Sequence, residues 1–394
     1  MAILRVKTYF CTAKPCLMLD ILLTASVSFI ISFLAVPVVL QIAEQKKLFD
    51  VPDERKVHTL PVPSLGGVGI FGGFLLASLL SIQGYINPEF QYFFAASLVI
   101  FFLGLKDDLL VLSASKKFIG QVIAASILIH LGGIRLDSMH GLFGFDAVPE
   151  GFGLALSYLT IIVVINSFNL IDGVDGLASS LGIFTTLIFG SYFFIIGEQS
   201  YALLAFAMTG SLVAFLIFNH HPAKIFMGDS GSLMIGLVNA ILVIKFINTA
   251  DQPYVAMPVE SAVAVGFSIL IVPLLDTLRV FSIRIYNGNS PFTPDRNHVH
   301  HLLLEKGFGH KAITFICLVV NAGFVALAYF ARSMGPTLLL LLMLTLSFIG
   351  FGLLYYRRPR RSLVIAKKFN GATELKQTSK VVTLTQEAAA VEEK

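Results

Sequence analysis

Charged side chains are scarce in this sequence. Asp, Glu, Lys and Arg make up only 13% of its 394 residues, whereas 56% are hydrophobic and the mean hydropathy is +0.82. A soluble domain carries about 25% charged residues, so this chain has too little charge to solvate the surface of a single-domain soluble enzyme. It also has too much apolar surface to remain disordered. The composition therefore leaves a polytopic membrane protein.

Cysteine and tryptophan are scarce as well. The three cysteines, Cys11, Cys16 and Cys317, are too few and too scattered for a disulfide framework or a zinc site. Tryptophan is absent, so the 35 phenylalanines supply most of the aromatic bulk that faces lipid. The net charge is only +4, and no basic helix is interleaved with aromatic residues. Nucleic acid is therefore excluded as a partner.

Long apolar runs dominate what is present. A helix needs roughly 20 apolar residues to cross a bilayer, and the sequence predicts an all-α polytopic membrane protein with about 11 transmembrane helices. These spans are expected at 20–42, 64–82, 90–105, 117–132, 152–169, 177–196, 201–218, 231–248, 258–281, 312–331 and 336–356. The Gly-rich segment 133–151 predicts a small hairpin on the outer face.

Basic residues predict the orientation and the domains. Of the 28 Lys and Arg, 22 lie in the C-terminal tail and in or beside the loops that follow odd-numbered spans, against 5 on the opposite side. The positive-inside rule places the N-terminus outside and the C-terminus in the cytoplasm. Residues 1–19 form a lead-in, 20–356 the integral membrane domain, and 357–394 a flexible cytoplasmic tail, basic and then acidic.

Acidic residues gather on the predicted cytoplasmic side. Asp107 and Asp108 end the third span, and Asp229 precedes the eighth, between Gly228 and Ser230. Adjacent carboxylates at an apolar boundary repel each other, and a divalent cation relieves that repulsion. The alternatives are a solvated charge pair for the first two and a helix N-cap for Asp229, which also suits a phosphate site.

A second polar cluster follows the fifth span. Asn166, Asn169, Asp172 and Asp175 recur every three residues, so a continuous helix would present them as a polar stripe. No Lys or Arg in this loop neutralises the acids. The alternative is a helix connection in which Asn and Asp serve as caps, but that needs one or two polar residues rather than four.

Basic clusters lie in two further loops on the same side. Loop 282–311 contains Asp295, Arg296, His298, His300 and His301, which suit a diphosphate better than zinc because no cysteine is near. The alternative there is a solvated basic loop.

Loop 50–67 contains Lys56 and His58, either as a phosphate contact or as a positive-inside anchor. Asp276 and Arg279 have the i,i+3 spacing of a salt bridge.

This one-sided arrangement predicts an enzyme at the membrane face. Acidic groups for a cation and basic groups for phosphate are typical of phosphoryl transfer. A membrane transporter, the alternative from another class, would place ionisable residues near the midplane of the bilayer. The one candidate for such a residue is Lys245, and it lies near the outer end of the eighth span.

Five stretches resemble, in order, the motifs of the polyprenyl-phosphate N-acetylhexosamine-1-phosphate transferases, of the bacterial undecaprenyl-phosphate GlcNAc-1-phosphate transferase type. They are DVPDERKVHTLPVPSLGG, GLKDDLL, NSFNLIDGVDGLA, FMGDSGS and PFTPDRNHVHHLLL, and the resemblance runs from about residue 45 to 311. Relatives that carry muramyl-pentapeptide have three consecutive histidines and usually ten spans. This chain has HVHH and about 11 predicted spans instead, so these phospho-N-acetylmuramoyl-pentapeptide transferases of peptidoglycan synthesis are the second choice within the family.

The resemblance implies a phosphotransferase reaction. N-acetylhexosamine-1-phosphate, with GlcNAc as the first expectation, passes from a UDP-sugar to undecaprenyl phosphate, and UMP is released. The product starts a lipid-linked glycan such as lipopolysaccharide or teichoic acid. The resemblance also implies Mg2+, for which Mn2+ can substitute, a homodimer surrounded by membrane lipid, and a place in the bacterial inner membrane with the active site facing the cytoplasm.

The resemblance further implies residue roles. Asp229 is the principal magnesium ligand, and Asp107 and Asp108 share the roles of metal ligand and base. Substrate contacts are implied for the nucleotide-facing Asn166, Asn169, Asp172 and Asp175, for the diphosphate clamp Arg296, His298, His300 and His301, and for Lys56 and His58. Direct attack by the lipid phosphate is favoured over a phospho-aspartate route, because a phosphate monoester is already largely ionised near neutral pH.

Overall fold

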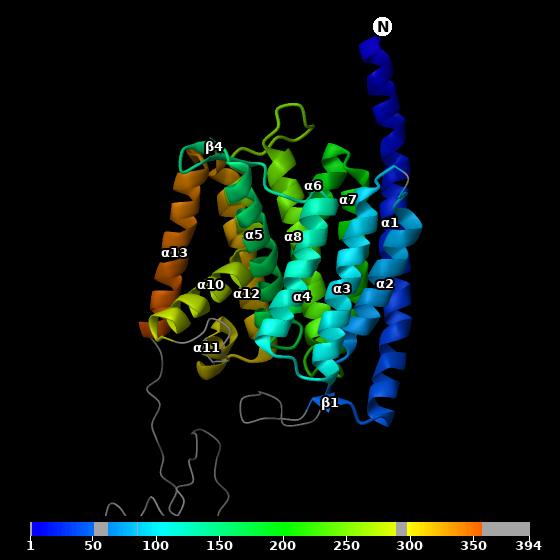
Figure 1. Cartoon of the computed structure of the whole chain (residues 1–394), viewed down its shortest axis with the longest axis vertical. Coiled ribbons are helices and arrows are strands. Elements are labelled where there is room, and N and C mark those ends of the chain that lie inside the picture. Colours follow the sequence, from blue (N-terminus) through cyan, green and yellow to red (C-terminus); the bar gives the residue numbers. More distant parts are fainter. Residues whose placement is uncertain (1, 51–61, 85, 289–297, 357–394) are drawn as a thin grey trace, which may run out of the picture.

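The computed structural model describes residues 2–50, 62–84, 86–288 and 298–356, which form a helical bundle (Figure 1). The long helices of the first half are α1 (Ala2–Gln45), α2 (Gly66–Ser81), α3 (Glu89–Leu109), α4 (Ala114–Ser126), which continues into the π-helical turn η1 (Ile127–Leu131), α5 (Glu150–Ile171) and α6 (Leu177–Ile196). The second half contains α7 (Gln199–Asn219), α8 (Gly228–Ala250), α9 (Ala262–Ile269), α10 (Ile271–Tyr286), α11 (Val299–Glu305), α12 (His310–Phe330), the 3₁₀ turn η2 (Arg332–Met334) and α13 (Pro336–Tyr356). Two short antiparallel sheets pair β1 (Phe49–Asp50) with β2 (Val62–Pro63) and β3 (Ser138–Leu142) with β4 (Phe145–Ala147).

The prediction of a polytopic, mostly helical membrane protein is confirmed. Within the described residues, seven helices are long and apolar enough to cross a membrane, or eight if the bent pair α9–α10 is one span. Helices also occupy the remaining expected segments, but α2, α3 and α4 are not among those seven. Helix α8 lies at the centre of the bundle, because 94% of the residues in its most apolar stretch are buried.

The expected ninth span is broken, which corrects the prediction of one continuous helix over 258–281. Helices α9 and α10 meet at Leu270 with a bend of 85°. Pro273 has no N–H to donate to the carbonyl of Ile269. The buried Asn321 of α12 replaces that bond, because its Nδ2 donates to the Ile269 oxygen at 2.9 Å and its Oδ1 accepts the Val272 N–H at 3.2 Å.

Replacing Asn321 with leucine should therefore destabilise the protein. The change keeps the branching at Cγ but leaves the Ile269 carbonyl and the Val272 N–H without this partner, at about 1–3 kcal/mol for each buried group. We expect the thermal unfolding midpoint in detergent to fall by several degrees. Val319→Leu, at an exposed position of the same helix, is the matched control. An unchanged midpoint for Asn321→Leu would contradict this account of the break.

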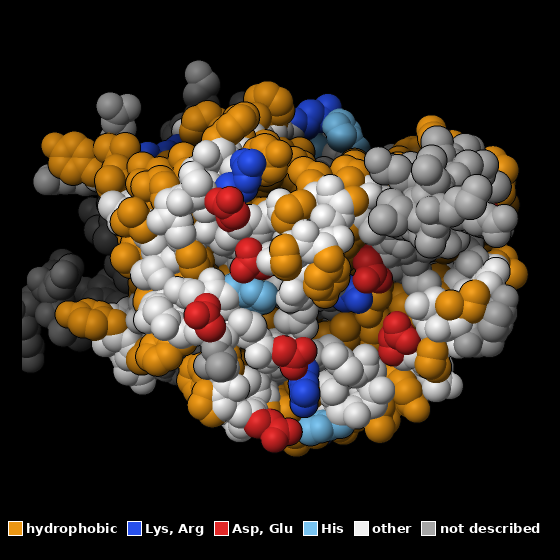
Figure 2. Space-filling view, turned by 90° about the horizontal axis from the view of Figure 1, so that it is seen from above, with side chains coloured by type: hydrophobic (Ala, Val, Ile, Leu, Met, Phe, Trp, Pro, Cys, Tyr) orange, Lys and Arg blue, Asp and Glu red, His pale blue; other side chains and the backbone are white. Residues whose placement is uncertain are grey.

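The predicted hairpin is present. Its strands pair Ser138 with Ala147 and Leu142 with Phe145, and both turn residues between them, Phe143 and Gly144, have positive φ, as a type I′ turn requires. The hairpin lies at the end of the bundle opposite β1 and α11 (Figure 1). Figure 2 views that end, where acidic side chains are spread singly over the surface.

Candidate active site

The α3–α8 contact is so close that it requires glycine. A Cβ on Gly104 would overlap the backbone of Ser230, and a Cβ on Gly228 would overlap the carboxylate oxygens of Asp108. Gly228 also has a φ of +72°, which L-residues with a side chain rarely adopt. The contact brings the last turn of α3, with its two aspartates, onto the first turn of α8.

Asp108 caps α8 from the neighbouring helix. Its Oδ1 accepts the Asp229 N–H at 2.7 Å, and its Oδ2 accepts the Ser230 N–H at 3.1 Å and the Ser230 hydroxyl at 2.6 Å. A carboxylate at this position satisfies free N–H groups and is stabilised by the helix dipole. The idea that Asp229 itself is the N-cap is therefore wrong: α8 begins at Gly228, and Asp229 lies in its first turn.

Asp229 and Asp107 are joined by Lys117, which the sequence analysis did not single out. The Lys117 ammonium lies 2.6 Å from the Asp229 Oδ2 and also pairs with the Asp107 Oδ2. The Asp229 Oδ1 accepts the Asn169 amide at 2.9 Å, and the Asp107 Oδ1 accepts the Leu112 N–H at 2.6 Å. Residues from α3, α4, α5 and α8 thus meet at one cluster.

The predicted stripe of four polar residues is not one helical face, because α5 ends at Ile171. Asn166 faces α4, where its Nδ2 donates to the Gln121 Oε1 at 2.7 Å. Asn169 faces Asp229, and Asp172 follows the helix as its C-cap. Asp175 lies in the next turn and contacts other loops. The four residues therefore serve different contacts, although all remain at the same end of the bundle.

Negative charge is in excess at this end. Burial raises the pKa of Asp172 to about 8, and the neighbouring carboxylates of Asp229, Asp108 and Asp175 add to the shift. Lys117 supplies one positive charge to the Asp107–Asp229 pair. A hard divalent cation prefers carboxylate oxygens and would relieve the remaining repulsion. The donor set therefore fits magnesium.

The histidine segment is held by a buried carboxylate. The Asp276 Oδ2 lies 2.9 Å from the His298 Nδ1, while its Oδ1 accepts the Val299 N–H at 2.8 Å and an Arg279 N–H at 2.9 Å. The predicted Asp276–Arg279 salt bridge is confirmed. The His298 Nε2 lies 3.5 Å from an Arg284 nitrogen. Both ring nitrogens of His298 are thus engaged by protein groups.

His300 lies against the loop that carries Asp172. A Cβ added to Gly173 would overlap the His300 ring, so the absence of a side chain at Gly173 permits this contact. Burial lowers the pKa of His300 to about 3, and the nearby His301 adds to the shift, so the ring is neutral at physiological pH. The histidine segment and the acidic end of α5 therefore form one surface.

Replacing Asp276 with asparagine should weaken the binding of an anionic substrate. The amide keeps the size but removes the charge that orients His298 and Arg279, so the Michaelis constant for the UDP-sugar that the resemblance implies should rise about tenfold. Steady-state kinetics measures this. Asp251→Asn is the matched control, because Asp251 also pairs with a histidine, His140 at 3.2 Å, but at the hairpin end. A fall in kcat without a change in Michaelis constant would contradict this positioning role.

Three predicted site residues, Lys56, His58 and Arg296, lie outside the described residues. The structure brings the others to one end of the bundle. It adds Lys117, Arg284, His221 and His310, which sequence reasoning did not single out. Lys117 is the second of two adjacent lysines at the start of an apolar helix, a weak signal, and His221 precedes a proline just before the FMGDSGS motif.

An acidic cluster facing neutral and basic groups at the end of an apolar bundle defines a membrane enzyme that handles anionic substrates. Residues 90–247 match the glycosyl transferase family 4. The chain is 32% identical over 309 residues to the decaprenyl-phosphate N-acetylglucosaminephosphotransferase of Mycobacterium tuberculosis (strain ATCC 25618 / H37Rv), covering 73% of this chain and 76% of the relative.

Two undecaprenyl-phosphate alpha-N-acetylglucosaminyl 1-phosphate transferases are similar too. The chain is 30% identical to that of Yersinia pestis, covering 71% of this chain and 75% of the relative. It is 28% identical to that of Escherichia coli (strain K12), covering 84% and 91%. The chain therefore belongs to the polyprenyl-phosphate N-acetylhexosamine-1-phosphate transferases of glycosyl transferase family 4, as its motifs predicted.

Proposed function

We propose that the protein transfers GlcNAc-1-phosphate from UDP-GlcNAc to undecaprenyl phosphate and releases UMP, which starts a lipid-linked cell-surface glycan. The names of the similar proteins support both the sugar phosphate and the polyprenyl acceptor. The observation that carries the proposal is the cluster in which Lys117 joins Asp107 to Asp229, beside the loop of Asp172. It can stabilise a phosphoryl group in transfer by charge and position.

Magnesium is the proposed cofactor, with Mn2+ as a substitute. Asp229 is its principal ligand, and Asp107 is the second carboxylate within reach, because both share Lys117. Asp108 supports the site by holding the first turn of α8 in place. When bound, the cation neutralises phosphate charge.

Direct attack by the lipid phosphate is the proposed mechanism. A phosphate oxygen of the lipid forms a bond to the β-phosphorus of the UDP-sugar, and the bond to the UMP oxygen breaks. Each carboxylate oxygen of Asp107, Asp108 and Asp229 accepts a hydrogen bond or pairs with Lys117, which lowers its nucleophilicity and favours attack by the lipid phosphate. An enzyme of this kind exchanges no labelled UMP into UDP-GlcNAc unless a lipid acceptor is present.

The nucleotide and diphosphate contacts follow from the same arrangement. Asn169 and Asp172 are proposed to face the nucleotide, and His300 and His301 to contact the diphosphate together with Arg296. Asn166, Lys56 and His58 remain proposed substrate contacts. For His298 the proposal is narrower than the sequence suggested: it orients Arg284, because its nitrogens face Asp276 and Arg284.

An apolar cavity of about 730 Å3 is the proposed site for part of the prenyl chain. It is bounded by α5, α8, α9, α10 and the hairpin, and on α5 its lining ends at Val164, two residues before Asn166. Its lining includes Phe145, Phe152, Leu156 and Val164. A chain in this cavity would leave its phosphate near the end of α5, because that helix leads directly to Asn169 and Asp172.

The proposed topology has eleven spans across the bacterial inner membrane. The N-terminus lies outside, and the active site faces the cytoplasm. Support comes from Figure 1, where successive long helices alternate in direction and the acidic end of α3 lies opposite the hairpin. In the sequence, the basic loops follow the odd-numbered spans, which favours the cytoplasm for those loops.

A panel of donors tests the proposed substrate. The purified protein, Mg2+ and undecaprenyl phosphate are mixed with UDP-GlcNAc, UDP-GalNAc or UDP-MurNAc-pentapeptide, and UMP is measured. We expect the highest kcat/KM for UDP-GlcNAc. Preference for the muramyl-pentapeptide donor would replace this proposal by peptidoglycan precursor synthesis, and transport of a solute without UMP release from any donor would overturn the enzyme itself.

A further inference from the structure

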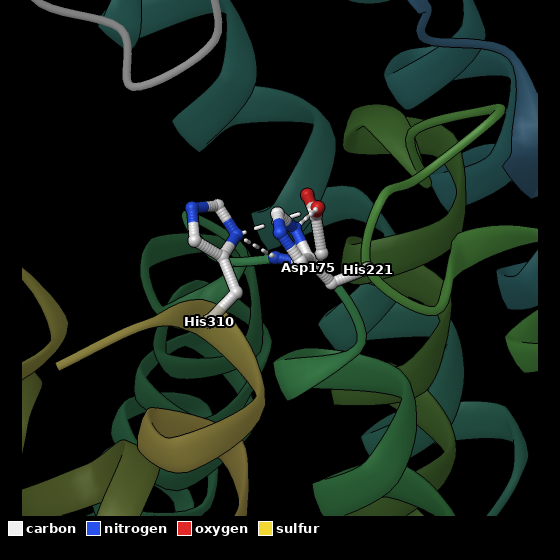
Figure 3. Close-up of side chains that lie close together, drawn as sticks. All are labelled: Asp175, His221 and His310. Carbon is white, nitrogen blue, oxygen red and sulfur yellow. Dashed lines mark hydrogen bonds and ion pairs between the residues drawn. The ribbon is translucent and has the colours of Figure 1, made fainter.

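Three side chains from separate segments converge beside the proposed active site (Figure 3). Asp175 lies between α5 and α6, His221 lies between α7 and α8, and His310 begins α12. The His221 Nδ1 is 2.7 Å from the Asp175 Oδ2, and the His310 Nδ1 is 3.4 Å from the same oxygen. Among the described residues, this is the group whose nitrogen and oxygen atoms are close enough to share a metal ion.

A lone pair and a carboxylate meet within this group. The His310 Nδ1 accepts the backbone N–H of Asp175 at 3.2 Å with its single lone pair, so an ion that binds this nitrogen would replace that hydrogen bond. The same nitrogen faces the anionic Asp175 Oδ2. Two electron-rich atoms thus approach each other, and a cation that both atoms coordinate would make the contact favourable.

Burial strengthens this argument. The Asp175 side chain is only 1% exposed, and a buried carboxylate needs a positive partner or several hydrogen bonds. The groups facing it include the two imidazoles and the Ala223 N–H, at 3.2 Å. The His221 side chain is 41% exposed, so an ion can enter from solvent on that side.

The donor types select the ion. Magnesium prefers oxygen ligands, whereas two imidazole nitrogens and one carboxylate oxygen suit zinc and related first-row metals. Zinc–nitrogen bonds of about 2.0–2.1 Å place the ligands of a tetrahedral site about 3.3 Å apart. The observed separations of 2.7 and 3.4 Å are near that value. Three protein ligands leave the fourth position for water.

We propose that Asp175, His221 and His310 bind one divalent transition-metal ion of the zinc type. The ion joins the α5–α6 loop, the α7–α8 loop and the start of α12. It is separate from the proposed magnesium site and has a structural role, because it fixes the loop that also carries Asp172. The proposal does not depend on the transferase activity.

Cobalt binding tests the proposal, because tetrahedral Co2+ with nitrogen ligands gives visible absorption bands and replaces zinc. The full-length protein, prepared without a polyhistidine tag, is stripped with EDTA and titrated with Co2+ in excess Mg2+, which occupies the oxygen-rich site. We expect one equivalent to bind and Zn2+ to displace it. His221→Ala and His310→Ala should lose the bands. His220→Ala, an exposed neighbour outside the group, should keep them.

Thermal stability gives a second readout. Zinc should raise the unfolding midpoint of the wild-type protein and of His220→Ala by a few degrees, and should not raise that of His221→Asn, a milder change for use if the alanine variants do not fold. No cobalt bands in the wild-type protein, or equal bands in all variants, would overturn the proposal and leave a hydrogen-bonded cluster. UMP release in Mg2+, measured separately, reports on the proposed function alone.

Discussion

Replacing Asp229 with asparagine is expected to lower kcat for UMP release by about 10³-fold. The amide keeps the shape of the side chain, and its oxygen can still accept the Asn169 amide. It removes the negative charge that pairs with Lys117 and that is proposed to bind magnesium. Because these interactions act on the transferred phosphate, the loss should appear in kcat more than in the Michaelis constant of the UDP-sugar.

The control for this variant is Asp137→Asn. Asp137 undergoes the same chemical change, is exposed, and pairs with Arg135 at the hairpin end of the bundle. Its activity should match that of the wild-type protein. If Asp229→Asn keeps more than about a tenth of wild-type kcat, well above the loss expected for a catalytic electrostatic group, Asp229 is not at the centre of the reaction.

Replacing Lys117 with methionine is expected to lower kcat by about 10²-fold and, at the same time, to tighten magnesium binding. The ammonium group pairs with the same carboxylates that are proposed to bind the cation, so removing its charge leaves Asp107 and Asp229 more negative. A lysine that only stabilises the fold would not change the magnesium dependence. The measurement is the rate of UMP release as a function of Mg2+ concentration.

Lys116→Met is the matched control for that experiment. Lys116 precedes Lys117 on α4 and is exposed, so losing it removes the same charge without touching the carboxylates. Weaker magnesium binding in Lys117→Met, or an equal effect in both variants, would contradict the direct pairing of Lys117 with the site.

The sequence predicted the broad design because its signals are local. Long apolar runs identify helices wherever they pack, and a Gly-rich alternating segment identifies a hairpin, as Ser138 to Ala147 confirm. The acidic residues of the candidate site could also be singled out, because Asp107, Asp108 and Asp229 stand out against apolar spans. Their common location at one end follows from the alternation of helix direction.

What the sequence could not provide depends on contacts between distant helices. Asp108 looks equivalent to Asp107 in the chain, but the close crossing at Gly104 turns it toward the first turn of α8. Lys117 has no motif around it and gains its role only from the position of α4. The pairing of Asp175 with His221 and His310 joins residues 46 and 135 positions apart, which no local pattern reveals.

Two predictions were wrong: the polar stripe on α5 and the continuous ninth span. In each, the helix ends or bends although the residue pattern continues. A three-residue spacing predicts a helical face only while the helix continues, and α5 stops at Ile171. In the ninth span the apolar run continues, but Pro273 removes one backbone bond and Asn321 of another helix supplies its replacement. Pro273 could have indicated that the helix breaks here. The 85° angle between α9 and α10, however, depends on how these helices pack.

The most direct test of the account identifies both products of one turnover. The purified protein is mixed with UDP-GlcNAc, undecaprenyl phosphate and Mg2+, and the nucleotide and lipid products are quantified by chromatography and mass spectrometry. Transfer of the sugar phosphate predicts UMP and undecaprenyl-diphospho-GlcNAc in equal amounts. Release of UDP with a lipid monophosphate sugar, or release of UMP without any lipid product, would contradict it.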